Sequence, residues 1–379
     1  MKHEEDGDLH CVTWSHDGDL IISGSGASKI YVWKSTSGEL LRTLQCGAED
    51  SQIVDDVVVS PNGELLISGS EDGKVRVWKL SSGELVRTLE GHDEWVNAVA
   101  VSPDGALIAS ASDDYSVRVW KSNTGEHVRT LKGHDDYVYG VAFSADGQLI
   151  VSASTDATVR VSNIALGQCL RILHHDSAVN AVAVSSDGHI VSGSKTVGVW
   201  DVLQSADPGK ITEADASDPP CVTVRIPVKT MGKHSNEIQA VQVSRDCQLI
   251  ASAGSDRKVK LWTAAGELLR TFDKHTKSLI DVAISPDGKR IASGSEDGVI
   301  YVWKRRCDLC VETLHRTGPE DHEARRRFRC ALRDLSTGEV LQTMKHEEDG
   351  DLHCVTWSHD GDLIISGSGA SKIYVWKST

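Results

Sequence analysis

Residues 91–121 read GHDEWVNAVAVSPDGALIASASDDYSVRVWK, and this stretch decides the fold. Its segment 96–102 alternates with a period of two, which is typical of a half-buried β-strand. Pro103, Asp104 and Gly105 then predict a tight hairpin, because Asp-Gly tolerates the positive φ that such turns need. Three further strands are expected over 106–112, 116–120 and 127–131. The stretch therefore predicts a unit of four short antiparallel strands.

This unit recurs along the whole chain. Aligning the copies on the Trp that ends the third strand gives eight positions, of which one carries Ser instead: Trp33, Trp78, Trp120, Ser162, Trp200, Trp262, Trp303 and Trp376. No helical periodicity of comparable strength accompanies them. Repeated four-stranded units are typical of the blades of a β-propeller. We therefore expect one all-β domain over 1–379, folded as a closed propeller.

The repeats resemble the WD40 family closely. The matching features are Gly-His pairs at 91–92 and 133–134, Ser-Pro/Ala-Asp-Gly turns at 102–105, 144–147 and 285–288, and third strands that end in Val-Trp. The Trp is followed by Lys in most copies, and by Asp only at Trp200. The resemblance covers nearly the whole chain. It implies a ring of blades that serves as an interaction platform rather than as a catalyst.

His92, Ser110 and Asp114 have the residue types of a catalytic triad. The resemblance implies a different role, namely a hydrogen-bonded chain inside the blade that also includes the Trp. An active site would be unique, whereas the complete set occurs three times, as His92/Ser110/Asp114/Trp120, His234/Ser252/Asp256/Trp262 and His275/Ser293/Asp297/Trp303. We therefore expect a structural role, no enzymatic activity, no cofactor and no metal. The copies that depart from this set, such as the one with Ser162, are expected to be looser.

Residues 1–36 recur residue for residue at 344–379. The outer strand expected at 40–44 matches the sheet of either copy, since both copies present the same strands. One arrangement has eight blades, the last with three strands, and the other has seven blades and a displaced copy. Eight blades are favoured, because a displaced copy would expose an apolar face. A displaced copy would also allow a strand-swapped dimer instead of a monomer.

Two insertions interrupt the repeats, at 202–220 and 315–338. The outer strands beside them are expected at 221–228 and at 309–314, and 329–343 looks like the last two strands of a truncated extra unit. Cys307, Cys310 and Cys330, with His315 and His322, include residue types that bind zinc. Their spacing matches no common zinc pattern, so we interpret these cysteines as incidental.

The net charge of −15 argues against binding to nucleic acid or to an anionic membrane, and it favours basic partners. No signal peptide and no apolar run of transmembrane length is visible. The nine Cys are odd in number and irregularly spaced, which suggests no disulfide framework. We expect a cytoplasmic protein.

Large aromatics fall at equivalent loop positions on neighbouring repeats, beside several carboxylates. The residues predicted to bind a partner are Trp95, Asn97, Asp113, Tyr137, Tyr139, Glu237 and Gln239. Aromatic anchors with steering charges are typical of binding hot spots, so we expect a basic peptide or loop of another protein. The alternative interpretation is that these aromatics only pack loop against loop. Two further alternatives are an engineered or recombined propeller without a native partner, and an enzyme with a metal in its central channel.

Overall fold

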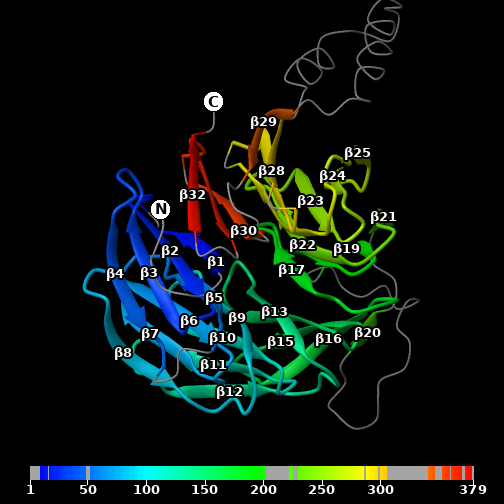
Figure 1. Cartoon of the computed structure of the whole chain (residues 1–379). Coiled ribbons are helices and arrows are strands. Elements are labelled where there is room, and N and C mark those ends of the chain that lie inside the picture. Colours follow the sequence, from blue (N-terminus) through cyan, green and yellow to red (C-terminus); the bar gives the residue numbers. More distant parts are fainter. Residues whose placement is uncertain are drawn as a thin grey trace, which may run out of the picture.

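The structure of the chain, a computed structural model, describes residues 9–15, 17–47, 52–201, 222–224, 229–285, 287–297, 299–304, 340–345, 352–358, 360–368 and 372–377. Over these ranges the chain forms strands and turns, and contains no helix that could cross a membrane. The strands build eight sheets that follow one another around a ring in sequence order (Figure 1). The predicted all-β propeller is confirmed.

The first four blades each begin with their innermost strand and proceed outwards. The first blade contains β1 (Leu9–Trp14), β2 (Leu20–Ser25), β3 (Lys29–Lys34) and β4 (Leu40–Gln45). The second contains β5 (Val54–Val59), β6 (Leu65–Ser70), β7 (Val75–Lys79) and β8 (Glu84–Leu89). The third contains β9 (Val96–Val101), β10 (Leu107–Ser112), β11 (Val117–Lys121) and β12 (His127–Leu131). The fourth contains β13 (Val138–Phe143), β14 (Leu149–Ser154), β15 (Thr158–Asn163) and β16 (Gln168–His174).

The remaining blades continue the ring, and the last of them has three strands among the described residues. The fifth contains β17 (Ala181–Val184), β18 (His189–Gly193), β19 (Thr196–Asp201) and β21 (Lys229–Lys233). The sixth contains β22 (Ile238–Val243), β23 (Leu249–Gly254), β24 (Val259–Thr263) and β25 (Leu268–Phe272). The seventh contains β26 (Leu279–Ile284), β27 (Arg290–Ser295), β28 (Val299–Lys304) and β29 (Val340–Lys345). The eighth contains β30 (Leu352–Trp357), β31 (Leu363–Ser368) and β32 (Lys372–Lys377).

Burial explains the residue types along each blade. The second strands, such as β10, are buried along nearly their whole length, because a neighbouring blade covers each face. Close approach of two blades favours the small residues found there, such as Ala109, Ser110 and Ala111, which are fully buried. The outermost strands, such as β8, are largely exposed. The core is therefore a series of apolar layers between successive blades.

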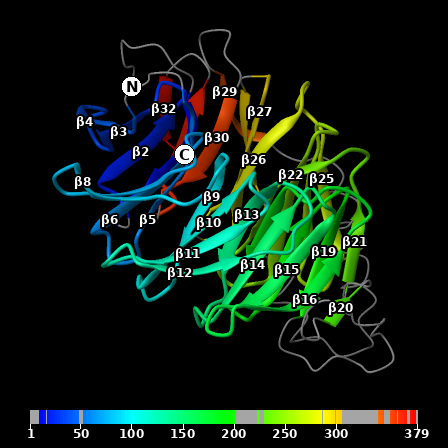
Figure 2. The same cartoon turned by 90° about the horizontal axis from the view of Figure 1, so that it is seen from below.

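The ring closes by contact between the two identical segments. β30 of the eighth blade lies against β1 of the first (Figure 1), and Figure 2 shows the blue first blade beside the red eighth. One core cluster joins Ile21, Tyr31 and Trp33 to Ile365 and Ile373. β4 pairs with β3, with Trp33 opposite Leu40, so the first copy has the outer strand. Because only 35–39 connect β3 to β4, this pairing costs little chain entropy. The arrangement with a displaced copy is thereby excluded.

The outer strands of the fifth and seventh blades differ from the sequence expectation. β21 pairs with β19, whereas β20 (Val222–Val224), which lies within 221–228, adds a parallel strand to β16 of the fourth blade. β28 pairs with β29 rather than with 309–314, which lies outside the described residues. The expectation that 221–228 and 309–314 are outer strands was therefore wrong. In the fifth blade, Met231 of β21 is fully buried and supplies the apolar contact that an outer strand needs.

The fourth blade accommodates its missing Trp by changes elsewhere. Ser162 stands opposite Ile150, as Trp120 stands opposite Ile108 in the third blade. Phe143 and Ile164 are both buried in the core cluster between the third and fourth blades. These two larger side chains supply apolar volume at the interface where the neighbouring blades place an indole.

Candidate functional site

The two faces of the ring are formed by different loops. The upper face carries the loops that lead into each innermost strand, such as 93–95, and those between second and third strands, such as 113–115. The lower face carries the turns between first and second strands, such as 103–106. Every predicted partner-binding residue lies on the upper face or just below it, because each stands in or beside one of its loops.

The upper-face loops are held by a hydrogen-bonded chain within the blade. In the third blade, Nδ1 of His92 lies 2.7 Å from Oδ2 of Asp114, and Nε2 lies 2.8 Å from Oγ of Ser110. The indole N–H of Trp120 donates to the same Ser110 oxygen at 3.2 Å. With Nδ1 donating to the carboxylate, Nε2 is left to accept the hydroxyl proton. Ser110 is fully buried, so no substrate can reach its oxygen.

The same chain of contacts recurs in the sixth and seventh blades. His234 lies 2.8 Å from Asp256 and 2.9 Å from Ser252, and Trp262 donates to Ser252 at 3.0 Å. The seventh blade repeats this with His275, Ser293, Asp297 and Trp303. Burial would raise the pKa of Asp297, but hydrogen bonds from His275 and the backbone N–H of Thr276 lower it to about 2. Recurrence, burial and an ionised carboxylate together describe a brace for the loops.

The fifth blade lacks the Asp and shows what the carboxylate contributes. Nε2 of His175 lies 2.8 Å from Oγ of Ser192, as in the other blades, but Nδ1 lies 3.0 Å from the hydroxyl of Ser194. Without a carboxylate in contact, burial lowers the pKa of His175 to about 4. This histidine is therefore neutral at physiological pH.

Four aromatic side chains form an exposed patch on the upper face of the third and fourth blades. Trp95, Tyr115, Tyr137 and Tyr139 make up this aromatic patch, and each is between 41% and 48% exposed. The ring of Tyr137 lies 5.7 Å from that of Tyr115 and 6.5 Å, edge to face, from that of Tyr139. Tyr115 is not among the residues predicted from sequence. Its φ of 66° belongs to the turn before β11 and presents the ring beside Tyr137.

Carboxylates crowd the inner side of this patch. Burial and the nearby charges of Glu71, Asp56 and Asp113 raise the pKa of Asp55 to about 8. Oδ2 of Asp55 is buried and has no hydrogen-bond partner among the described residues. Burial likewise raises the pKa of Asp113, although Nδ2 of Asn97 donates to it at 2.7 Å. Burial and the carboxylates of Asp113, Asp136 and Asp55 also raise the pKa of Tyr139, so these groups share one electrostatic environment.

The innermost strands explain which predicted residues come together. The second residue of each such strand occupies an equivalent place around the ring, and this set includes His10, Asp55, Asn97, Tyr139, Gln239, Ile280 and His353. Asn97, Asp113 and the aromatics thus meet on adjacent blades. Glu237 and Gln239 belong to the sixth blade, with a blade between them and the patch, and Gln239 donates to Ser255 at 2.9 Å.

The described residues contain no group of three or more His, Cys, Asp or Glu side chains arranged to hold a metal ion. The cysteines considered as zinc ligands, Cys307, Cys310 and Cys330, lie outside the described residues.

Comparisons with known proteins agree with this architecture. A family model described as WD domain, G-beta repeat matches eight segments of the chain, at 2–34, 38–79, 83–121, 125–162, 167–201, 225–263, 266–304 and 338–377. Among solved structures, the chain is similar to the crystal structure of the computationally designed Ika8 protein, with 24% identity and a TM-score of 0.74 over 100% of this chain and 98% of that one. At this identity the likeness shows the fold alone. A comparison with curated proteins finds no match. Because the family model matches most of the chain, repeat by repeat, this protein belongs to the WD40 repeat family of β-propellers.

Proposed function

We propose that the protein is a non-catalytic scaffold that binds a basic peptide or loop of another protein at the aromatic patch. WD40 propellers generally serve as interaction scaffolds. The observation that carries the proposal is the pairing of this exposed patch with a buried carboxylate, Asp55, whose Oδ2 has no hydrogen-bond partner in the described part of the chain. A Lys or Arg side chain from a partner, bound beside Asp55, would supply the positive charge that this carboxylate lacks.

Each part of the patch contributes a different term to binding. Trp95 and Tyr137 each offer an exposed aromatic face to a Lys or Arg side chain, a contact worth about 0.5–2 kcal/mol. Asp55 and Asp113 would neutralise its charge. The net charge of −15 would attract a basic partner from a distance. The alternative that the aromatics only pack loop against loop is disfavoured, because all four remain more than two-fifths exposed.

Peptide selection from a display library at neutral pH tests the proposal. We expect the selected peptides to be rich in Lys and Arg. The variant with Trp95→Ala and Tyr137→Ala should no longer bind these peptides, although its melting temperature should be unchanged. Leu85→Ala is the matched control, because Leu85 is similarly exposed but lies on an outermost strand. Selected peptides without cationic residues, or peptides that bind the double variant as tightly as the parent, would contradict the proposal.

Proton release gives a second test. The pKa of Asp55 is raised to about 8 by burial and neighbouring carboxylates, so most of its population is protonated at pH 7. A cation bound beside it would lower that pKa and expel the proton. Calorimetry in buffers of different ionisation enthalpy should show proton release on binding to the parent protein, and much less with Asp55→Asn.

The duplication favours a second candidate, a recombined or engineered propeller without a native partner. The identity of 1–36 and 344–379 is complete, whereas the other repeats match only in pattern. The coding sequence of the two segments tests this origin. Identical codons would indicate a recent duplication, and recoded copies would indicate design. If the protein is natural, we propose that it is located in the cytoplasm.

A further inference from the structure

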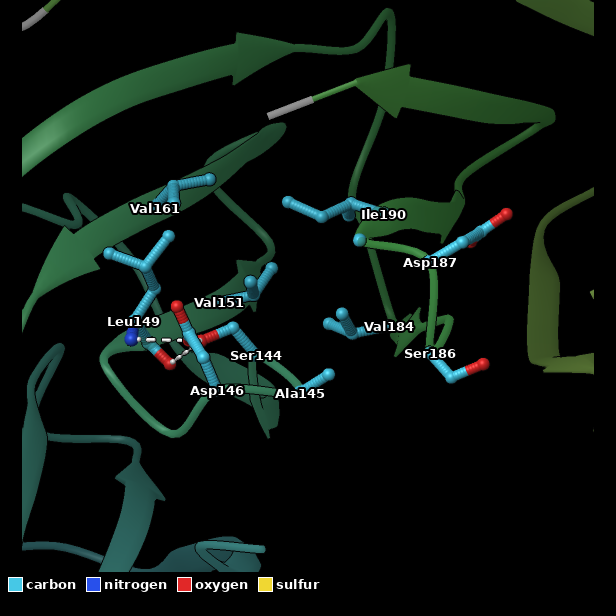
Figure 3. Close-up of a pocket in the computed structure, with 11 residues that line it drawn as sticks. Ser144, Ala145, Asp146, Leu149, Val151, Val161, Val184, Ser186, Asp187 and Ile190 are labelled. Carbon is cyan, nitrogen blue, oxygen red and sulfur yellow. Dashed lines mark hydrogen bonds between the residues drawn. The ribbon is translucent and has the colours of Figure 1, made fainter. Parts of the chain in front are cut away.

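A recess lies on the lower face, between the fourth and fifth blades. Figure 3 shows it between the turn that joins β13 to β14 and the turn that joins β17 to β18. Its volume is about 230 Å³, and its apolar walls are formed by Leu149, Val151, Val161, Val184 and Ile190. Val151, Val161 and Ile190 also belong to the core cluster between these blades, so the floor of the recess is part of the packed core.

The sequence explains why the recess lies at this interface. In the second and third blades the lower turn carries a proline, whose ring reaches the next blade. A Cβ built on Gly105 would lie 3.9 Å from Cδ of Pro61, and one on Gly147 would lie 3.6 Å from Cδ of Pro103. The fourth blade has the smaller Ala145 at this position. No ring extends from Ala145 towards the fifth blade.

The fifth blade also contributes a shorter turn. The N–H of Ser185 donates to the carbonyl of His189, four residues on, whereas the N–H of Ser102 donates to the carbonyl of Leu107, five residues on. One residue is therefore missing from the turn that forms the opposite wall. A small residue on one side and a shortened turn on the other leave this interface open.

Two carboxylates lie at the edge of the apolar walls. The hydroxyl of Ser144 and the N–H of Gln148 donate to Asp146 and lower its pKa. The hydroxyl of Ser185 donates to Asp187, and with a contribution from His189 it lowers the pKa of Asp187 to about 2. Nδ1 of His189 lies 3.1 Å from Oδ1 of Asp187, and both side chains are exposed. Both carboxylates are therefore ionised at neutral pH beside an apolar recess.

We propose that this recess is a second peptide site, which takes one large apolar side chain from a segment that carries Lys or Arg next to it. The volume limits the occupant: an apolar cavity of about 150 Å³ admits benzene, and sites for whole drug-sized ligands begin near about 300 Å³. A single Leu, Met or Phe side chain suits about 230 Å³. Asp146 and Asp187 select for a flanking cation. A second copy of this acidic chain is disfavoured by like charge.

Methyl NMR spectroscopy of the full chain tests the proposal with a defined probe. The probe is the peptide acetyl-Gly-Lys-Phe-Lys-Gly-amide, and its two controls replace Phe by Ser or both Lys by Glu. We expect the Phe-Lys peptide to shift the methyl signals of Leu149, Val151, Val161, Val184 and Ile190 in a saturable way. Neither control peptide should do so at the same concentration.

Variants separate filling of the recess from its charge. Ala145→Phe should fill the recess and weaken binding of the Phe-Lys peptide by about tenfold or more. The variant is expected to fold, because the sixth blade carries the large Arg245 at this turn position. Asp187→Asn should weaken binding of the peptide. Asp104→Asn, which changes the corresponding turn carboxylate of the third blade, should not.

Several outcomes would overturn the inference. The recess is not a peptide site if the methyl signals stay in place up to millimolar probe, or if the Ser control shifts them equally. The inference is also wrong if the Ala145→Phe variant binds the peptide as tightly as the parent protein does. The variant with Trp95→Ala and Tyr137→Ala should leave these shifts unchanged, so failure at one face is distinguishable from failure at the other.

Discussion

The imidazole rings of His10 and His353 stack with their centroids 4.9 Å apart, where the first and eighth blades meet. These residues occupy the same position in the two identical segments, so the duplicated sequence contacts itself across the closure of the ring. Identical sequence does not give identical surroundings. The indole N–H of Trp357 donates to Ala283 at 3.0 Å, whereas that of its counterpart Trp14 is buried with no partner among the described residues.

Deletion of 352–379 should therefore strongly destabilise the protein. It removes the eighth blade but keeps β29, which completes the seventh. The cut exposes Tyr31 and Trp33 on one side and Ile300 and Val302 on the other, all of which are buried in the closed ring. Thermal melts with light scattering should show a loss of several kcal/mol or aggregation. A monomeric and equally stable truncation would contradict the closed eight-bladed ring.

Ser252→Ala should destabilise the protein without affecting peptide binding. Its buried hydroxyl contacts both His234 and Trp262, so the change leaves two buried polar groups without their partner. We expect a loss of about 1–3 kcal/mol in urea unfolding. Ser82→Ala, in an exposed turn, is the control. An unchanged stability would show that the brace contributes nothing to the fold.

Restoring the family's Trp in the fourth blade should be harmful. Phe143 and Ile164 already supply bulk at that interface, so Ser162→Trp would overpack it and cost about 1–3 kcal/mol. Adding Phe143→Val and Ile164→Ser, the residues of the third blade at these positions, should recover most of the loss. Measured free energies of unfolding of the single and triple variants test whether the added Trp overpacks the interface. A stabilising single substitution would mean that the interface has spare volume.

The repeat pattern predicted the fold class and the number of blades because each copy carries its own periodicity and turns. It failed for two outer strands, where insertions displaced the expected position. A better signal was present: outer strands follow a Gly-Glu pair in 38–39, 83–84, 125–126 and 266–267, and the same pair at 338–339 precedes β29. Counting back from the His works equally well, since Met231 stands three residues before His234, as Leu131 does before His134.

The candidate site was harder to predict than the fold. Trp95, Tyr137 and Tyr139 were recognisable, because equivalent positions of a repeat lie on one face. The buried and unpartnered Oδ2 of Asp55 was not, because the burial of Asp55 comes from packing and one of its charged neighbours, Asp113, lies on the adjacent blade. The lower recess depends on a missing proline and a missing residue in two different turns, and it becomes visible only when the blades are assembled.

His175 should make the protein sensitive to mild acid. Its pKa is lowered to about 4 by burial, against about 6.5 when unfolded. Between these values the unfolded chain binds a proton that the folded chain does not, so stability falls as the pH drops from about 6.5 to 4. The loss is about 3 kcal/mol at most. Unfolding curves of the parent and of His175→Gln should converge as the pH falls through this window, and parallel curves would refute the assignment.

Asp55→Asn should stabilise the protein and at the same time weaken its binding to a partner. The pKa of Asp55, raised to about 8 by burial and the charges of Glu71, Asp56 and Asp113, lies above its unfolded value of about 3.9. The unfolded chain therefore releases this proton first, and the parent loses stability as the pH rises from about 4 to about 8. The variant escapes this cost, so its advantage in unfolding free energy should grow across that window.

Gln239→Ala is the matched control for this prediction, since Gln239 occupies the equivalent position in the sixth blade, carries no charge and donates to the hydroxyl of Ser255. Its effect on stability should not depend on pH in the same way. Peptides selected for binding to the parent should bind Asp55→Asn more weakly, despite its greater stability. Such a trade-off is expected where a site keeps an unfavourable charge for a partner to neutralise. A variant that is more stable and binds equally well would assign Asp55 to the fold alone.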